Sequence, residues 1–386
     1  MRGKVLLLFS PLILILSYIY YDVNKRERLE EQQFEILKEK GMDNKICKII
    51  KSDYKFGDLF QLNDEFIIAS TINDEVLYEY KYLTEYIKKG KIFALNIKSK
   101  ELFEIPIKNF PDNLIFSPLG IDILNKEYLY VINHSGTPNG SNEQIEVFKI
   151  ILSEEKKIEL IYEKSIILPK TFFGTLKGIA VIDLNSFFFT TSNFFSLPLK
   201  NSIYEKILFK IKQMIEKVLK SYRIQSTFVY LYENGIISKV KESNSLLNSG
   251  ITYDSKFKFL FSTRTIEKDI QMYKILDLLN ESYRFNSIKL PYNINKIVFK
   301  DKKLYCGITS NIHYIKTIKK EIKEKGNANH ISHFSGFIEI SLHKDNNITD
   351  ILLQDKFKAV SSAIKVEKKI ILSSVVENGL FICEDK

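Results

Sequence analysis

Short runs of alternating apolar and polar residues recur from residue 56 to the end of the chain, and they constrain the fold more than any other feature. Turn residues or charged pairs separate more than a dozen such runs, among them EFIIAST, KIFALNI, YLYVINH, QIEVFKI, SFFFTTS, KFKFLFS, GFIEISL and KIILSSV. Each run has the length and period of a β-strand. Sandwiches, barrels and propellers all contain many short strands, but more than a dozen are too many for one sandwich. The sequence therefore predicts an all-β chain, folded as a β-propeller.

One segment, residues 199–225, has the period of a helix instead. Lysines cover most of its remaining surface, and its apolar residues are Ile203, Leu208, Ile211, Ile215, Val218 and Leu219. This spacing predicts an amphipathic, basic helix inserted between two blades. Two interpretations stay open at this point: the apolar stripe lies on the propeller itself, or the helix rests in an anionic membrane interface.

The N-terminus combines a basic start with an apolar stretch. Arg2 and Lys4 precede residues 5–21, which carry no charge, and no small-x-small cleavage site follows. Seventeen apolar residues are at the lower limit for crossing a bilayer, so we expect an uncleaved signal anchor, with a cleaved signal peptide as the alternative. Positive charges flank both sides of the stretch and leave its orientation open. The predicted segments are an anchor over 1–25, a helical stalk over 26–46 and the propeller over 47–386.

The cysteines and sequons bear on the compartment. Behind a signal sequence a disulfide between the first and last strands becomes reasonable, whereas in a cytosolic protein Cys47, Cys306 and Cys383 would be unrelated thiols. Sequons at Asn133, Asn139, Asn280 and Asn347 permit glycosylation in a secretory lumen. We therefore expect a single-pass membrane protein whose propeller is lumenal or extracellular. The formal charge of +10 is scattered without a basic block, so no nucleic-acid partner is expected.

Five segments, taken in order, are similar to segments of the paraoxonase/arylesterase family. They are FSPLGIDILNKEYLYVINHSG with IEVFKI, TLKGIAVIDLNSFFFTTSNFF, NSGITYDSKFKFLFSTR, YNINKIVFKDKKLYCGITSN and VSSAIKVEKKIILSSVVENGLFICEDK. The resemblance implies a six-bladed propeller with calcium in its central tunnel, an uncleaved N-terminal segment and a Cys47–Cys383 disulfide. It leaves Cys306 as a free, buried thiol, and it aligns 199–225 with a helix that associates with membranes.

The resemblance also implies a chemistry, the hydrolysis of lactones and aryl esters. In the family a calcium ion polarises the carbonyl group while a histidine pair activates water. Here one histidine of that pair corresponds to His134 and the other to Leu119. A small hydrophobic ester or lactone would be the substrate, and the membrane would be the other partner, through the anchor and the helix 199–225.

The calcium positions can be compared one by one. They correspond to Gly57-Asp58, Lys177-Gly178, Asn248 (or Ser249 after a one-residue shift) and Asn295-Lys296 (or Tyr292-Asn293 in another register). Only Asp58 keeps an acidic side chain, and calcium prefers six to eight oxygen ligands. We therefore predict weak metal binding, with Lys177 or Lys296 filling the vacated volume and meeting Asp58. Two functions follow as alternatives: a hydrolase of this family with lost or altered activity, or a non-catalytic binding or scaffold propeller.

Overall fold

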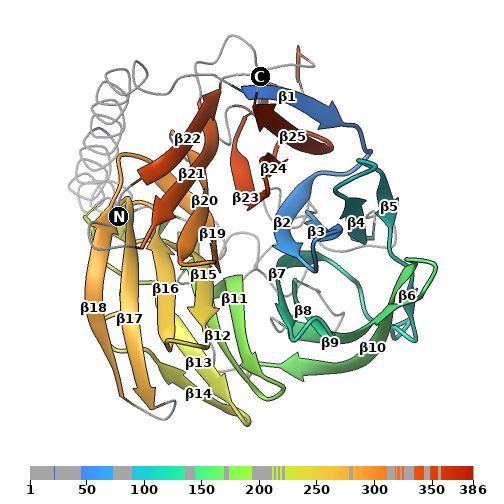
Figure 1. The fold of residues 1–386 in the computed structure, drawn as a ribbon. Coiled ribbons are helices and arrows are strands. Elements are labelled where there is room, and N and C mark those ends of the chain that lie inside the picture. The colour runs from blue at the N-terminus through green and yellow to red at the C-terminus, as the bar shows by residue number, and fades with distance from the viewer. Residues whose placement is uncertain are drawn as a thin grey trace, which may run out of the picture.

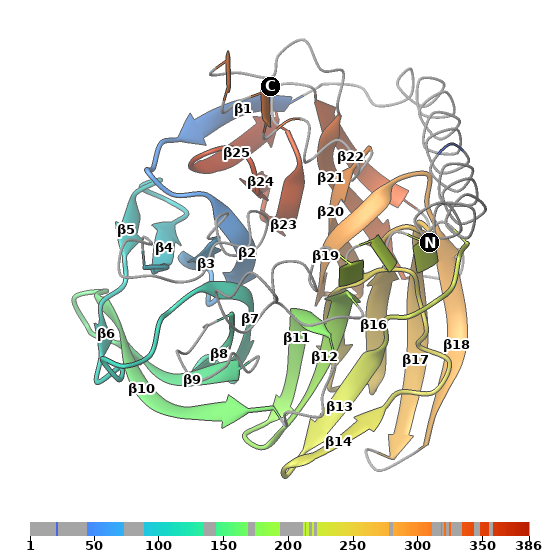
Figure 2. The same cartoon turned by 180° about the vertical axis from the view of Figure 1, so that it is seen from behind.

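The protein is a ring of six β-sheets around a central axis, seen from its two faces in Figure 1 and Figure 2. A computed structural model describes residues 45–72, 89–134, 144–168, 174–193, 222–277, 281–310, 334–342, 348–354 and 358–385, together with Tyr21 and single positions within 211–219 and 318–325. Each sheet is one blade, and its first strand lies beside the first strands of the two neighbouring blades. The predicted six-bladed β-propeller is confirmed.

The blades follow one another along the chain, and the innermost strand of each comes first. The first blade contains β2 (Phe56–Gln61), β3 (Phe66–Thr71), β4 (Ile92–Asn96) and β5 (Leu102–Glu104). The second contains β7 (Pro118–Leu124), β8 (Tyr128–Asn133), β9 (Gln144–Leu152) and β10 (Ile158–Ile167), and β6 (Ile107–Lys108) pairs parallel to β10 at its edge. The third contains β11 (Thr175–Asp183), β12 (Ser186–Asn193), β13 (Val229–Glu233) and β14 (Ile236–Lys239).

The remaining blades repeat this arrangement with one change. The fourth contains β15 (Asn248–Asp254), β16 (Phe259–Arg264), β17 (Asp269–Asp277) and β18 (Glu281–Lys289). The fifth contains β19 (Asn293–Lys300), β20 (Lys303–Thr309), β21 (Ser335–Ser341) and β22 (Ile348–Gln354). The sixth contains β23 (Val360–Val366), β24 (Lys369–Ser374) and β25 (Leu380–Asp385), and its outermost strand is β1 (Lys45–Ile50) from the start of the ring.

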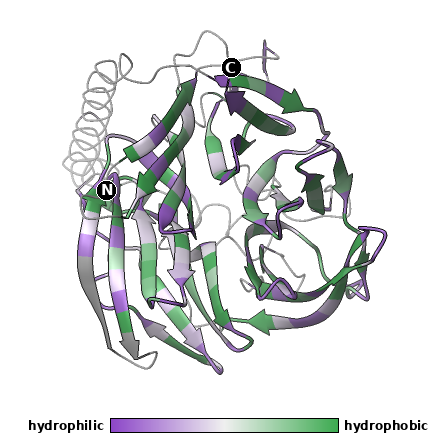
Figure 3. Ribbon diagram, viewed as in Figure 1, coloured by the Kyte–Doolittle hydropathy of each residue, from purple (hydrophilic) through white to green (hydrophobic). Residues whose placement is uncertain are grey.

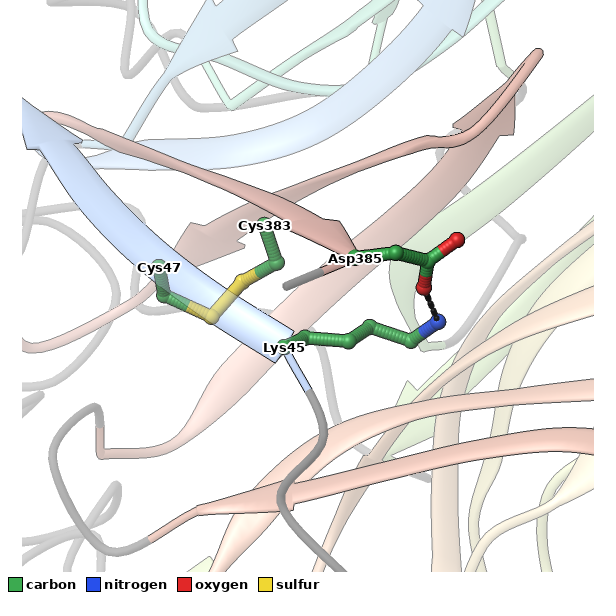
Figure 4. The surroundings of a disulfide bond; sticks show 4 residues. All are labelled: Lys45, Cys47, Cys383 and Asp385. Carbon is green, nitrogen blue, oxygen red and sulfur yellow. Dashed lines mark hydrogen bonds and ion pairs between the residues drawn. A yellow bond between two sulfur atoms is a disulfide. The ribbon is translucent and has the colours of Figure 1, made fainter.

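The sixth blade closes the ring covalently. Strand β1 pairs antiparallel with β25, and the register places Cys47 opposite Cys383, where the two form a disulfide. Beside it, Lys45 Nζ lies 2.9 Å from Asp385 Oδ1 (Figure 4). The predicted disulfide is confirmed, and Cys306 is the buried free thiol. The strand starts at Lys45, two residues before the predicted boundary at 47.

The hydrophobic core is a ring of clusters between neighbouring blades. Strands such as β3 and β21 are buried along their whole length, so both faces of a blade meet its neighbours, and Figure 3 shows hydrophobic stretches on strands all around the ring. One cluster joins the fifth, sixth and first blades and includes Phe337, Val360 and Phe56. Four other clusters join the remaining neighbours in turn. This packing holds the six innermost strands at fixed positions around the axis.

Several predictions for the termini and insertions concern residues that the structure does not describe. The apolar stretch 5–21 and the stalk fall there apart from Tyr21 and the start of β1, as do most of 199–225 and the sequons at Asn139, Asn280 and Asn347. No helix within the described residues has the length and apolarity needed to cross a bilayer. The anchor and the inserted helix therefore stay predictions. The sequon at Asn133 is a different case, because this side chain is fully buried and hydrogen-bonded, which leaves no room for a glycan in the folded chain.

Candidate functional site: an ion pair in the central cavity

The innermost strand of every blade is interrupted at the same height. Its pairing with the second strand shifts by a bulge at Gly57-Asp58, Leu119-Gly120, Lys177-Gly178, Ser249-Gly250, Asn295-Lys296 and Ser361-Ser362. A small cavity of about 20 Å³ lies at the axis, and nearly all these residues line it. Since β-bulges redirect side chains and often occur beside active sites, this ring is the candidate functional site.

Glycine holds the second position of the bulge in three consecutive blades because the strands approach closely there. A Cβ on Gly120 would lie 2.5 Å from the carbonyl oxygen of Lys177, and one on Gly178 would lie 2.5 Å from that of Ser249. A Cβ on Gly250 would lie 2.6 Å from the carbonyl oxygen of Asn295. These glycines let adjacent inner strands touch backbone to backbone, which keeps the cavity narrow.

The substitution Gly178→Ala should lower the free energy of unfolding by about 1–3 kcal/mol, since the new methyl group meets a backbone oxygen that cannot rotate away. Gly57→Ala is the matched control in the same ring. Its Cβ would lie 3.2 Å from Leu119 Cδ1, the end of a flexible side chain. Chemical denaturation followed by circular dichroism measures both. Equal losses in the two variants would contradict the close-approach argument.

Two of the three blades without glycine at this position place opposite charges in the cavity, and the third has Ser362 there. Lys296 Nζ lies 2.7 Å from Asp58 Oδ2, and both side chains are more than nine-tenths buried. The carboxylate also accepts the backbone N–H of Leu59 on Oδ1, at 2.8 Å, and that of Ile121 on Oδ2, at 3.0 Å. Lys296 Nζ in turn donates to the carbonyl oxygen of Ile121, at 3.4 Å. The pair therefore ties together the fifth, first and second blades through the axis.

A second lysine lines the same cavity. Lys177 is half-buried, and burial lowers the pKa of its amine; the Lys296 ammonium lowers it further, while the Asp58 carboxylate opposes both. On the neighbouring β7, Asp122 Oδ2 accepts the backbone N–H of Val181 at 2.6 Å. Burial raises the pKa of Asp122 to about 6, against the opposing effects of that hydrogen bond and of Lys296. The cavity thus contains one amine more than its ion pair neutralises.

This set of groups does not fit a calcium ion. Calcium takes six to eight oxygen ligands, several of them carboxylates. Asp58 is the one carboxylate among the lining residues, and its oxygens already accept two backbone N–H groups and an ammonium. Asn295 directs its amide N–H to the carbonyl oxygen of Val360, at 2.6 Å. Among the described residues, no three His, Cys, Asp or Glu side chains group together to hold a metal.

The structure brings most of the predicted site residues together. Six of them line the cavity, namely Gly57, Asp58, Leu119, Lys177, Asn295 and Lys296, and Gly178 completes the bulge beside Lys177. The alternative registers are also distinguished. Ser249 lines the cavity, whereas Asn248 is buried away from it and donates to Thr227 and Ser243. Asn293 binds the carbonyl oxygen of Thr265, at 2.7 Å.

His134 is the residue that the resemblance assigns to the histidine pair. It is buried just after β8 and donates its backbone N–H to Ser117, at 3.0 Å, but it is not among the residues that line the cavity. The role of the preceding residue, Asn133, follows from its hydrogen bonds. Asn133 Oδ1 accepts the N–H of Ser117 at 2.7 Å, and its Nδ2 donates to the buried Glu146 at 2.8 Å. Asn133 therefore fixes the chain as it enters β7, two residues before Leu119.

Glu146 was not predicted from the sequence, and it is a buried carboxyl group that forms no ion pair with any residue the structure describes. Burial raises its pKa, and hydrogen bonds from Asn133 and Ser165 oppose that rise. The sequence does contain a signal for the ring of bulges around the central cavity. A glycine followed by isoleucine occurs five times, and three of these pairs, at 120–121, 178–179 and 250–251, lie in innermost strands. In those three strands the glycine is the second residue of the bulge.

Comparison with known proteins gives one informative match. A family model described as Arylesterase matches residues 83–298, more than half of the 386-residue chain. No individual curated protein matches the sequence.

Similar solved structures include a luciferin-regenerating enzyme, with a TM-score of 0.48 at 9% identity, covering 88% of this chain and 95% of that one. A gluconolactonase from Xanthomonas campestris has a TM-score of 0.48 at 7% identity and covers 89% of this chain and 91% of its own. A Bacteroides thetaiotaomicron protein of unknown function has a TM-score of 0.49 at 9% identity, covering 89% and 73%. Scores and identities this low decide nothing about activity.

Proposed function

The chain belongs to the arylesterase family, and on that premise we propose that it is a metal-independent, ligand-binding propeller in which the family's calcium-dependent hydrolysis of lactones and aryl esters has been lost. The observation that carries the proposal is the buried contact between Lys296 and Asp58. An ammonium ion in hydrogen-bond contact with the carboxylate supplies the positive charge that a metal would otherwise provide. It has no open coordination position for a carbonyl oxygen.

The replacement of one histidine of the family pair supports the same proposal. Leu119 occupies that position, is almost fully buried and lines the cavity, so it cannot accept a proton from water. The remaining member, His134, does not line the cavity. The scaffold is nevertheless retained, with six packed blades and a covalent closure. A retained scaffold with a changed centre fits a role in binding better than one in hydrolysis.

Hydrolysis of phenyl acetate and of a simple lactone, each with and without EDTA, tests the proposal. We expect no chelator-sensitive turnover, and we expect micromolar calcium to leave the melting temperature unchanged. The opposite result supports the second candidate, a calcium-dependent hydrolase, for which the family match is the specific observation. Chelator-sensitive turnover that disappears in Asp58→Ala, together with a saturable rise in melting temperature with calcium, would establish that candidate instead.

A further inference from the structure

Lys177 differs from the other charged groups of the cavity in having no opposite charge of its own. Within the described residues its amine makes no hydrogen bond or ion pair, whereas Lys296 Nζ is held by Asp58. The charged groups around it are Asp58 of β2, Lys296 of β19 and, on the neighbouring β7, Asp122, whose Oδ2 already accepts Val181 N–H. The rest of the cavity lining consists of the apolar side chain of Leu119, three glycines and the polar residues Ser249, Asn295 and Ser361.

We propose that Lys177 is a nucleophilic amine that forms an imine with a small carbonyl compound entering the central cavity. A lysine becomes nucleophilic when it is desolvated or placed beside another cation, because the neutral amine is then favoured. The first condition holds here, because burial lowers the pKa of Lys177; the Asp58 carboxylate opposes that shift, and the Lys296 ammonium, which lines the same cavity, adds to it. The proposal concerns the amine alone and stands whether or not any ester hydrolysis remains.

The reaction balances without a co-reactant. The lone pair of Lys177 Nζ attacks the carbonyl carbon, a C–N bond forms, and the carbonyl oxygen takes a proton to give a carbinolamine. Loss of that oxygen as water, with the remaining proton of the nitrogen, leaves the imine. The Lys296 ammonium lines the same cavity and favours negative charge on the oxygen as the C–N bond forms. The cavity of about 20 Å³ has room for a group the size of one or two water molecules, so only the carbonyl group of a small aldehyde or keto acid would enter it.

Reductive trapping on the full chain tests the proposal. The protein is incubated with glyoxylate and cyanoborohydride at pH 7, and peptide mapping by mass spectrometry gives a labelling rate for each lysine. Lys177 should be labelled severalfold faster than a surface lysine, because a lowered pKa leaves more of its amine neutral at pH 7. The internal comparators are Lys157, whose side chain is 76% exposed, and Lys296, which shares the cavity but is paired with Asp58.

The variant Lys177→Arg keeps a positive charge but has no nucleophilic amine. It should lose the adduct at position 177 while labelling at Lys157 stays the same. The rate at Lys177 should also level off at a lower pH than the rate at an ordinary lysine, because a lowered pKa lets the amine lose its proton at a lower pH. Because all comparators are read in one wild-type sample, poor folding of the variant leaves the test intact. Labelling of Lys177 no faster than that of Lys157, or preferential labelling of Lys296, would overturn the proposal.

Discussion

Replacing Lys296 by alanine should lower the free energy of unfolding by about 3–5 kcal/mol, because the change leaves the Asp58 carboxylate buried without its cation. Both side chains are more than nine-tenths shielded from water, so solvent cannot compensate for the lost contact. The chain has no tryptophan, and far-UV circular dichroism during urea denaturation is the practical measurement. The loss should exceed that of any single surface substitution, which usually stays within about 0.5 kcal/mol.

The double variant Asp58→Asn with Lys296→Met separates charge burial from packing. Removing both charges leaves no uncompensated ion, so this variant should recover most of the stability that Lys296→Ala loses. Lys157→Ala provides the surface control, since it breaks the contact with Glu155 between side chains that are 76% and 74% exposed. A small loss in Lys296→Ala, similar to that in Lys157→Ala, would show that the buried pair does not hold the three blades together.

Removal of the Cys47–Cys383 disulfide is the other change with a large expected effect. The two cysteines are 336 residues apart, so the bond restrains almost the entire unfolded ring. The variant Cys47→Ser with Cys383→Ser should lose about 2–5 kcal/mol, and it should melt at a lower temperature than the wild type. Reduction of the wild type with dithiothreitol should lower its melting temperature to the same extent.

The third cysteine makes the control for this experiment simple. Cys306 is a buried free thiol, so dithiothreitol should cause no further change in the double variant. An unchanged melting temperature on loss of the disulfide would mean that strand pairing alone closes the ring. The bond also agrees with an oxidising compartment, where structural disulfides persist.

The architecture could be predicted from the sequence because strand period and strand number are local features that add up along the chain. The positions of the site were predictable in the same way, since each bulge sits at a fixed place in its own strand. The contacts that each side chain makes in the site could not be predicted from the sequence. Lys177 and Lys296 are both at positions that the resemblance assigns to calcium ligands, but they occupy the first and the second place of their bulges. Lys296 is the lysine whose Nζ contacts Asp58, and this depends on distances across the ring rather than on the sequence of either strand.

His134 and its neighbour Asn133 show a second limit of prediction from sequence. A histidine at the end of a strand draws attention because imidazole has useful chemistry, whereas the asparagine before it does not. In the folded chain Asn133 links Ser117 to Glu146 and so fixes the start of β7. That contact joins the second strand of a blade to the residues ahead of the first, and nothing in the local sequence pattern reveals it. The structural role of Asn133 was therefore missed because the sequence directed attention to His134.

The position of the disulfide has a mechanical consequence. A force applied to the chain ahead of Lys45 enters the ring through β1, the outermost strand of the sixth blade. After only two residues the load reaches Cys47, and the sulfur–sulfur bond transmits it directly to β25. The ladder between the two strands extends from Lys45 to Ile50, and most of it then carries little shear. Under tension the ring would stay closed until the covalent bond is reduced.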